Sequence, residues 1–204
     1  MPLQNRVTPF GALVATAERG TMLGNRGILH DENRRVVRTS QVRRWLCCVL
    51  EFRGRQRTVM KPHSYTELFF LDEATAFAAG HRPCFECRRQ AALEFQRCWA
   101  RAYGRLPKAD EMDAVLGAQR RVRGGQKKTF FARGRALPDG AFIAAGGEAW
   151  LVHQRHLLRW TAAGYAERMG LGSGRLEVLT PEATLAVLRA GYVPLVHVSV
   201  SATE

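Results

Sequence analysis

The feature that most constrains this chain is a pair of cysteines, Cys84 and Cys87, separated by two residues. Such a pair lets two thiolates bind one metal ion from a tight turn, and structural zinc sites use four tetrahedral Cys or His ligands. The neighbouring Arg82, Arg88 and Arg89 favour the thiolate form of both cysteines. Five cysteines in all, an odd number, argue against a disulfide framework. We therefore predict a structural zinc site of which this pair supplies half.

The other two zinc ligands have several candidates upstream of the pair. Cys47, Cys48 and His63 are the nearest in sequence, with His30 further away. Adjacent residues of a strand point to opposite faces, so only one of the two neighbouring cysteines can face the metal. We expect Cys48 and His63 to complete the site. A redox pair, the main alternative use of Cys84 and Cys87, would be expected beside a β-α-β pattern that the sequence lacks.

Residues 69–88, with the sequence FFLDEATAFAAGHRPCFECR, resemble the second half of the Ada-type zinc domain, the metal-binding module of a bacterial DNA-repair protein. That family has an aromatic strand, a Glu-Ala helix, Ala-Gly and Arg-Pro-Cys-x-x-Cys in the same order. The resemblance implies that Cys84 and Cys87 bind zinc and that the module contacts DNA backbone. The family's upstream Cys-x-x-x-Cys pair, which holds its methyl-accepting cysteine, is missing here. Methyl transfer is therefore not implied.

The charge distribution predicts a polyanionic partner, either DNA or RNA. The formal net charge is +13, and residues 1–137 carry 26 Lys and Arg against 12 Asp and Glu. Residues 138–204 carry 5 against 6, so the whole excess lies in the first two thirds. An excess confined to one part of a chain suggests one binding face. The alternative is a basic surface that is merely solvated.

Two basic segments are candidates for contacts with nucleic acid phosphates. The first has no acidic residue between Gly117 and Leu137 and includes two aromatic residues, Phe130 and Phe131, that could stack on bases. Its basic residues are Arg120, Arg121, Arg123, Lys127, Lys128, Arg133 and Arg135. The second surface comprises Arg53, Arg55, Arg57, Arg88 and Arg89.

The pattern of elements predicts a single compact α+β domain with a zinc-knuckle module and mixed or antiparallel strands. We expect a hairpin over residues 45–60, a Gly-rich loop over 20–27, and helices over 73–79, 88–103, 110–122 and 182–190. Strands are expected over 141–144, 148–153, 156–160, 175–179 and 195–200. Residues 1–137 would form the basic zinc-knuckle region, and residues 138–204 a small α+β region packed on it.

The location and the possible reactions are less constrained by the sequence. No apolar run approaches the length of a membrane span, and the N-terminus lacks a signal-peptide pattern, so we expect a cytoplasmic protein without membrane contact. A zinc-dependent enzyme acting on nucleic acid or a nucleotide is an alternative. His30 and Glu32 with the cysteine pair match a deaminase signature in which Glu32 would be the acid and base. A scaffold that docks on a ribonucleoprotein is a further alternative.

Overall fold

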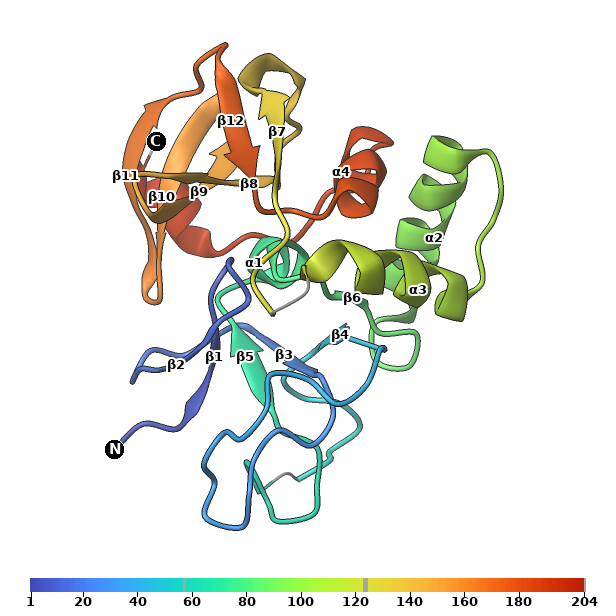
Figure 1. Cartoon of the computed structure of the whole chain (residues 1–204), viewed down its shortest axis with the longest axis vertical. Coiled ribbons are helices and arrows are strands. Elements are labelled where there is room, and N and C mark those ends of the chain that lie inside the picture. Colours follow the sequence, from blue (N-terminus) through green and yellow to red (C-terminus); the bar gives the residue numbers. More distant parts are fainter. Residues whose placement is uncertain (57, 123–124, 204) are drawn as a thin grey trace.

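A short helix, α1 (Glu73–Ala78), lies between two β-sheets at the centre of the protein (Figure 1). The structure is a computed structural model that describes residues 1–56, 58–122 and 125–203. All six residues of α1 are buried. Ala76 packs with residues of the first sheet, and Ala74 and Ala78 pack with residues of the second. The helix therefore joins the two halves of the core.

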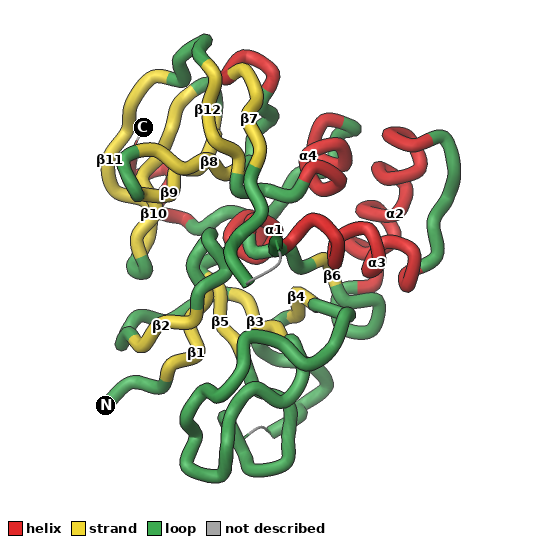
Figure 2. Tube along the Cα trace, in the orientation of Figure 1, coloured by secondary structure: helices red, strands yellow, loops and turns green. Residues whose placement is uncertain are grey.

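The first sheet is built from the N-terminal part of the chain and has the strand order β2-β1-β5-β3-β4-β6. Its strands are β1 (Gln4–Val7), β2 (Leu13–Ala15), β3 (Met22–Asn25), β4 (Leu46–Cys48), β5 (Leu68–Phe70) and β6 (Arg82–Pro83). The pairs β1–β5 and β4–β6 are parallel, and the other neighbouring pairs are antiparallel. Long loops connect β3 to β4 and β4 to β5 (Figure 2).

The second sheet is antiparallel throughout and has the order β11-β10-β9-β8-β12-β7. Its strands are β7 (Phe130–Arg133), β8 (Phe142–Ala145), β9 (Glu148–His153), β10 (His156–Thr161), β11 (Gly164–Gly170) and β12 (Arg175–Val178). Gly146 and Gly147, with φ of 60° and 80°, form the tight turn between β8 and β9. Positive φ at both central residues matches the twist of a two-residue hairpin.

Three longer helices lie to one side of the two sheets (Figure 2). They are α2 (Arg89–Tyr103), α3 (Ala109–Arg120) and α4 (Glu182–Arg189), and two short 3₁₀ helices cover Gly134–Ala136 and Val198–Thr203. Ala92, Phe95 and Trp99 recur at helical spacing and are buried, which is the pattern of an amphipathic helix. None of the helices in the described residues is long and apolar enough to cross a membrane.

The α+β class predicted from the sequence is confirmed, and so are the four helices, to within two residues at their ends. The predicted hairpin over residues 45–60 is wrong, because β4 pairs with β3 and β6 instead. The Gly-rich stretch expected to be a loop contains β3, and the expected last strand is a loop and a 3₁₀ helix. The second sheet begins with β7, upstream of the division expected at residue 137.

Two buried ion pairs fix α3 against the first sheet and the start of α2 against α1. Arg82, on β6, donates from Nε and Nη2 to the two carboxylate oxygens of Asp113, on α3, at 2.9 and 2.7 Å. Arg88 donates from Nη1 to Glu73 Oε1 on α1 at 2.5 Å. All four side chains are at most 6% exposed. Removing one member of such a pair would leave an uncompensated buried charge.

We predict that Asp113→Ala destabilises the protein by about 3–5 kcal/mol, because it leaves the buried charge of Arg82 without a partner. The matched control is Asp110→Ala on the same helix, whose carboxylate lies 3.8 Å from Arg44 with both side chains exposed. That change should cost at most about 1 kcal/mol. Urea unfolding of the two variants measures the difference, and equal losses would contradict the prediction.

Candidate metal centre

Three cysteine sulfurs come together at one edge of the first sheet. Cys48 ends β4, Cys84 directly follows β6, and Cys87 precedes α2 by two residues. Because β4 and β6 run parallel and Cys84 N–H donates to Cys47 O at 3.0 Å, the ends of the two strands are held side by side. The Sγ atoms of Cys48, Cys84 and Cys87 all lie within 4.8 Å of one another. Residues distant in sequence thus form one cluster.

Cys47 and Cys48 face opposite sides of the sheet, as strand geometry requires. Cys48 packs with Leu23 and Cys84, whereas Cys47 packs in the other cluster, between the sheet and α1. Arg88 Nη1 lies 3.6 Å from the sulfur of Cys47. Burial raises the pKa of the Cys47 thiol, so this cysteine stays protonated. The alternation therefore places Cys48, and not Cys47, in the cluster.

The backbone around the cysteine pair stabilises a thiolate. The N–H groups of Glu86 and Cys87 are directed at the sulfur of Cys84, and that of Val49 is directed at Cys87. Hydrogen bonds from Cys48 and Cys87, followed by these N–H groups, lower the pKa of Cys84. Hydrogen bonds with Cys84 and Cys87, and then burial, raise the pKa of Cys48. Three such close thiols do not all ionise without a cation between them.

This donor set fits a zinc ion. Thiolates are the soft ligands that zinc takes in structural sites, at a Zn–S distance of about 2.3 Å. Tetrahedral geometry at that distance separates two sulfurs by about 3.8 Å, so the three cysteines need to approach by at most about 1 Å. Cys48, Cys84 and Cys87 would hold the ion and leave one of its four positions to another ligand. Three close cysteines could therefore hold a metal ion.

The two histidines considered from the sequence do not join this cluster among the described residues. His63 is exposed in a turn, and its Nε2 lies 3.6 Å from Glu32 Oε1. His30 is buried elsewhere, with Nδ1 2.6 Å from Thr66 Oγ1 and Nε2 3.2 Å from Lys61 O. The His30 and Glu32 arrangement of a deaminase is thus not assembled around the cysteines, because the β3–β4 loop carries both residues away.

Several residues expected to contact nucleic acid are engaged inside the protein instead. Arg88 is buried against Glu73. Arg120 is 4% exposed and donates to the carbonyl oxygens of Gly80 and Arg43, both at 2.7 Å. These two arginines are unavailable to a phosphate on the outer surface, which corrects the expectation from the sequence. Charge density alone could not distinguish them from exposed arginines.

The remaining basic candidates are half-buried, exposed, or outside the described residues. Arg121 and Lys127 are half-buried, and each donates to a backbone carbonyl. Six others are exposed, namely Arg53, Arg55, Arg89, Lys128, Arg133 and Arg135. Arg57 and Arg123 lie outside the described residues. Phe131 is also exposed, and the guanidinium of Arg175 lies 5.5 Å from its ring centre.

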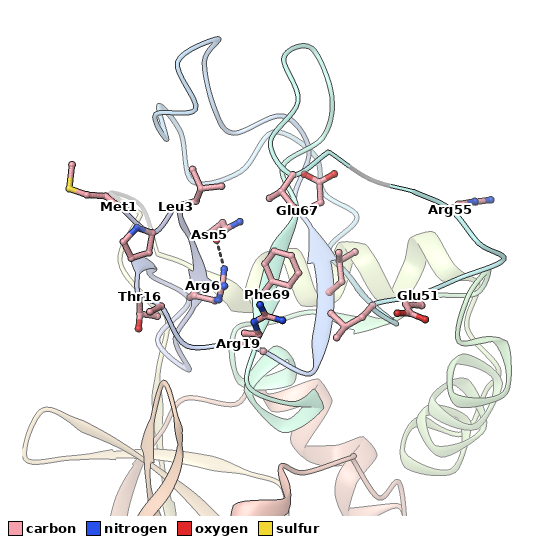
Figure 3. A pocket seen from close by; sticks show the side chains of 16 residues that line it. Met1, Leu3, Asn5, Arg6, Thr16, Arg19, Glu51, Arg55, Glu67 and Phe69 are labelled. Atoms are coloured by element: carbon pink, nitrogen blue, oxygen red, sulfur yellow. Dashed lines mark hydrogen bonds between the residues drawn. The ribbon is translucent and has the colours of Figure 1, made fainter.

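A cavity of about 990 Å³ adjoins the cysteine cluster on the same face of the sheet (Figure 3). Leu23 is opposite both Cys48 and Phe69 in the sheet, so the three share a face. Leu23 and Phe69 line the cavity and also pack against the cysteines. Arg6 lies with its guanidinium 4.7 Å from the Phe69 ring centre. No sequence motif marks these lining residues, because the sheet register brings them together.

Comparison of the chain with family models, with curated proteins and with solved structures gives no match. The resemblance of residues 69–88 to the Ada-type zinc domain therefore stays a prediction from the sequence. The segment has the expected order of elements, with β5, α1, a turn at Gly80 with φ of 94°, and then the cysteine pair. Such a φ is unstrained only for glycine.

We predict that Cys48→Ala lowers zinc affinity by more than about 100-fold. Loss of a hydrogen bond that supports a ligand already lowers metal affinity by about 10–100-fold, and loss of the ligand itself should lower it further. Cys47→Ala and Cys98→Ala are the matched controls, since both cysteines are buried and neither belongs to the cluster. Both should keep about one zinc per chain when dialysed against a chelator and analysed by mass spectrometry. Zinc loss in the Cys47→Ala protein, with full retention by Cys48→Ala, would contradict the assignment.

Proposed function

We propose that the protein binds a zinc ion through Cys48, Cys84 and Cys87 and binds nucleic acid backbone through basic residues beside that centre. The convergence of the three sulfurs is the observation that carries this proposal. In this proposal the zinc is structural, since it would tie β4 to the turn before α2. The module would then correspond to the part of the Ada-type domain that the sequence resembles.

The link between the metal and the basic surface is the ion pair of Arg55 with Glu86. Glu86 lies between the two cysteines of the pair, and its Oε1 is 2.6 Å from Arg55 Nη2. Residues 49–67 have no strand or helix in their described part, and the ion pair of Arg55 with Glu86 ties this loop to the turn that carries the cysteine pair. Arg53 and Arg89 are exposed on the same two segments. Zinc binding would therefore order a surface whose charge suits a phosphate backbone.

Salt dependence tests this surface. Each phosphate contact contributes about −0.9 to the slope of log affinity against log salt for duplex DNA, and about −0.7 for single strands. We expect Arg53→Gln with Arg55→Gln and Arg89→Gln to reduce the size of the slope by about 2–3. Fluorescence anisotropy with a labelled duplex and single-stranded DNA and RNA, from low to moderate salt, gives the slopes.

Two triple variants with the same change in net charge serve as controls. Arg38→Gln, Arg155→Gln and Arg189→Gln remove exposed charges elsewhere, and should leave the slope within about 0.5 of the wild type. Lys128→Gln, Arg133→Gln and Arg135→Gln remove the exposed members of the other candidate segment. The proposed surface would be overturned if either control variant reduced the slope as much as the Arg53, Arg55 and Arg89 variant. It would also be overturned if wild-type binding did not depend on salt.

The three-cysteine set also favours a second candidate, a zinc-dependent enzyme acting on nucleic acid or a nucleotide. Catalytic zinc sites have three protein ligands and keep the fourth position for water or substrate. The adjoining cavity has Arg6, Arg19 and Arg55 in its lining beside Glu51 and Glu67, and these arginines could bind an anionic group of such a substrate.

Cobalt substitution distinguishes an exchangeable fourth position from a closed one. In an enzyme site, we expect added cyanide to shift the visible absorption of the cobalt protein, because it replaces water at the metal. A site closed by a fourth protein ligand would give the same spectrum with and without cyanide, and would exclude this second candidate.

A further inference from the structure

Four cationic side chains gather around Trp45 and Gly11, away from the cysteine cluster. They are those of Arg26, Arg120, Arg121 and Lys127. The guanidinium carbons of Arg26 and Arg120 lie 4.0 and 4.4 Å from the centre of the Trp45 ring. Arg26 is completely buried, and Arg120 nearly so. We call these four residues the cation cluster.

Within the described residues, no member of the cation cluster forms an ion pair. The nearby Asp113 is already held by Arg82 through both carboxylate oxygens. Elsewhere this protein pairs its buried arginines, since Arg82 and Arg88 each have a carboxylate partner. An isolated buried charge is costly, and uncompensated burial of several like charges is more so. The charge of Asp113 raises the pKa of Arg120, but among the described residues no carboxylate forms an ion pair with the cation cluster.

The cluster also has hydrogen-bond donors without an acceptor. Gly11 O accepts from Arg26 Nη1 at 2.9 Å and from Arg121 Nη2 at 3.3 Å. Arg26 Nη2 and Arg120 Nη2 are buried and have no partner within the protein. Buried donors are nearly always satisfied, so such atoms call for an explanation. Two guanidinium groups of the same cluster therefore each keep one N–H nitrogen free.

The position of Gly11 shows where the donors converge. A Cβ atom built on Gly11 would lie 3.8 Å from both Arg26 Nη2 and Arg121 Nη2. The two nitrogens, together with the carbonyl oxygen of Ala79 at 3.9 Å, therefore surround the position beside Gly11 that no side chain occupies. A groove of about 580 Å³ reaches Trp45, Arg120 and Arg121 from the surface. An anion entering along this groove would meet Arg120 and Arg121 first, with Arg26 buried behind the Trp45 ring.

Burial and mutual repulsion lower the pKa values of cationic groups in the cluster. Burial lowers the pKa of Lys127 to about 7, with the charges of Arg26, Arg121 and Arg120 adding to the effect. Burial likewise lowers the pKa of Arg26, and Arg121 and Arg120 lower it further. A bound anion would reverse both effects, since an opposite charge favours the charged form.

We propose that the cation cluster is a binding site for phosphate, either free or as the monoester group of a nucleotide. Guanidinium groups bind phosphate oxygens through paired, charge-assisted hydrogen bonds, and a dianion would offset several positive charges at once. The inference goes beyond the proposed function and is independent of it. It needs neither zinc nor the exposed arginines beside the cysteines.

Thermal unfolding of the protein tests the site with inorganic phosphate replacing chloride at constant ionic strength. We expect a saturable rise in Tm of roughly 5–10 °C at a phosphate concentration 100 times Kd. Arg121→Gln, a change at a half-buried position, should reduce this shift at least by half, and Arg26→Met should abolish it. The exposed Arg38→Gln has the same change in charge and should keep the full shift.

Isothermal titration of the wild-type protein with phosphate provides a measurement that needs no variant to fold. Saturable binding of one phosphate per chain supports the site. Absence of saturable binding, or an equal Tm shift in the wild-type, Arg121→Gln and Arg26→Met proteins, overturns it.

The source of the phosphate is distinguished with an oligonucleotide carrying a 5′-phosphate and the same oligonucleotide with a 5′-hydroxyl. Competition with inorganic phosphate by only the phosphorylated form assigns the site to phosphate monoesters, and competition by neither assigns it to free phosphate. If the exposed-arginine variants leave nucleic acid binding unchanged while the phosphate response persists, the proposed function fails and this site stands.

Discussion

The burial of α1 is the constraint on which the rest of the structure depends. A helix of six residues is far too short to be stable alone, so its stability comes from tertiary packing. Asp72 caps it through Thr75 N–H, and its carboxylate also accepts hydrogen bonds from the hydroxyl of Tyr165 and the N–H of His197. One side chain therefore starts the helix and binds two segments of the C-terminal half. Both sheets pack on α1, and the helix depends on the packing of both.

The cysteine cluster and the cation cluster show two ways in which polar groups are placed in this core. Around the cysteines, the backbone N–H groups directed at sulfur suit thiolates, and the sheet register sets which cysteine takes part. In the cation cluster, backbone carbonyls bind part of each cation but supply no full negative charge. Carbonyl dipoles reduce the cost of burying a charge without removing it. In both proposed sites, a bound ion would supply the opposite charge.

Local signals in the sequence predict the elements whose stability is local, and fail where pairing is distant. The helices follow from caps, spacing and glycine stops, and the cysteine pair follows from its two-residue spacing. β3 was missed because Gly20 and Gly24 suggest a loop, whereas both lie against neighbouring strands where a Cβ would clash with backbone atoms. The sequence favours Cys48, but only the strand register shows that Cys48 and not Cys47 faces the cysteine pair. The burial of Arg26 has no local signal, since it depends on contacts with Gly11, Trp45 and His81.

Glu73 joins the cysteine pair to the far end of the chain. Its Oε1 accepts from Arg88 and from the hydroxyl of Tyr192, and its Oε2 accepts from the N–H of Leu195. Arg88 is the residue immediately after Cys87, so the segment beyond α4 contacts the same carboxylate that holds the turn of the cysteine pair. A protease cut before Tyr192 would separate from the rest of the chain both residues that donate to Glu73, while the ion pair of Glu73 with Arg88 would remain. Residues 192–195 thus help to hold the turn that carries Cys84 and Cys87, more than a hundred residues earlier in the sequence.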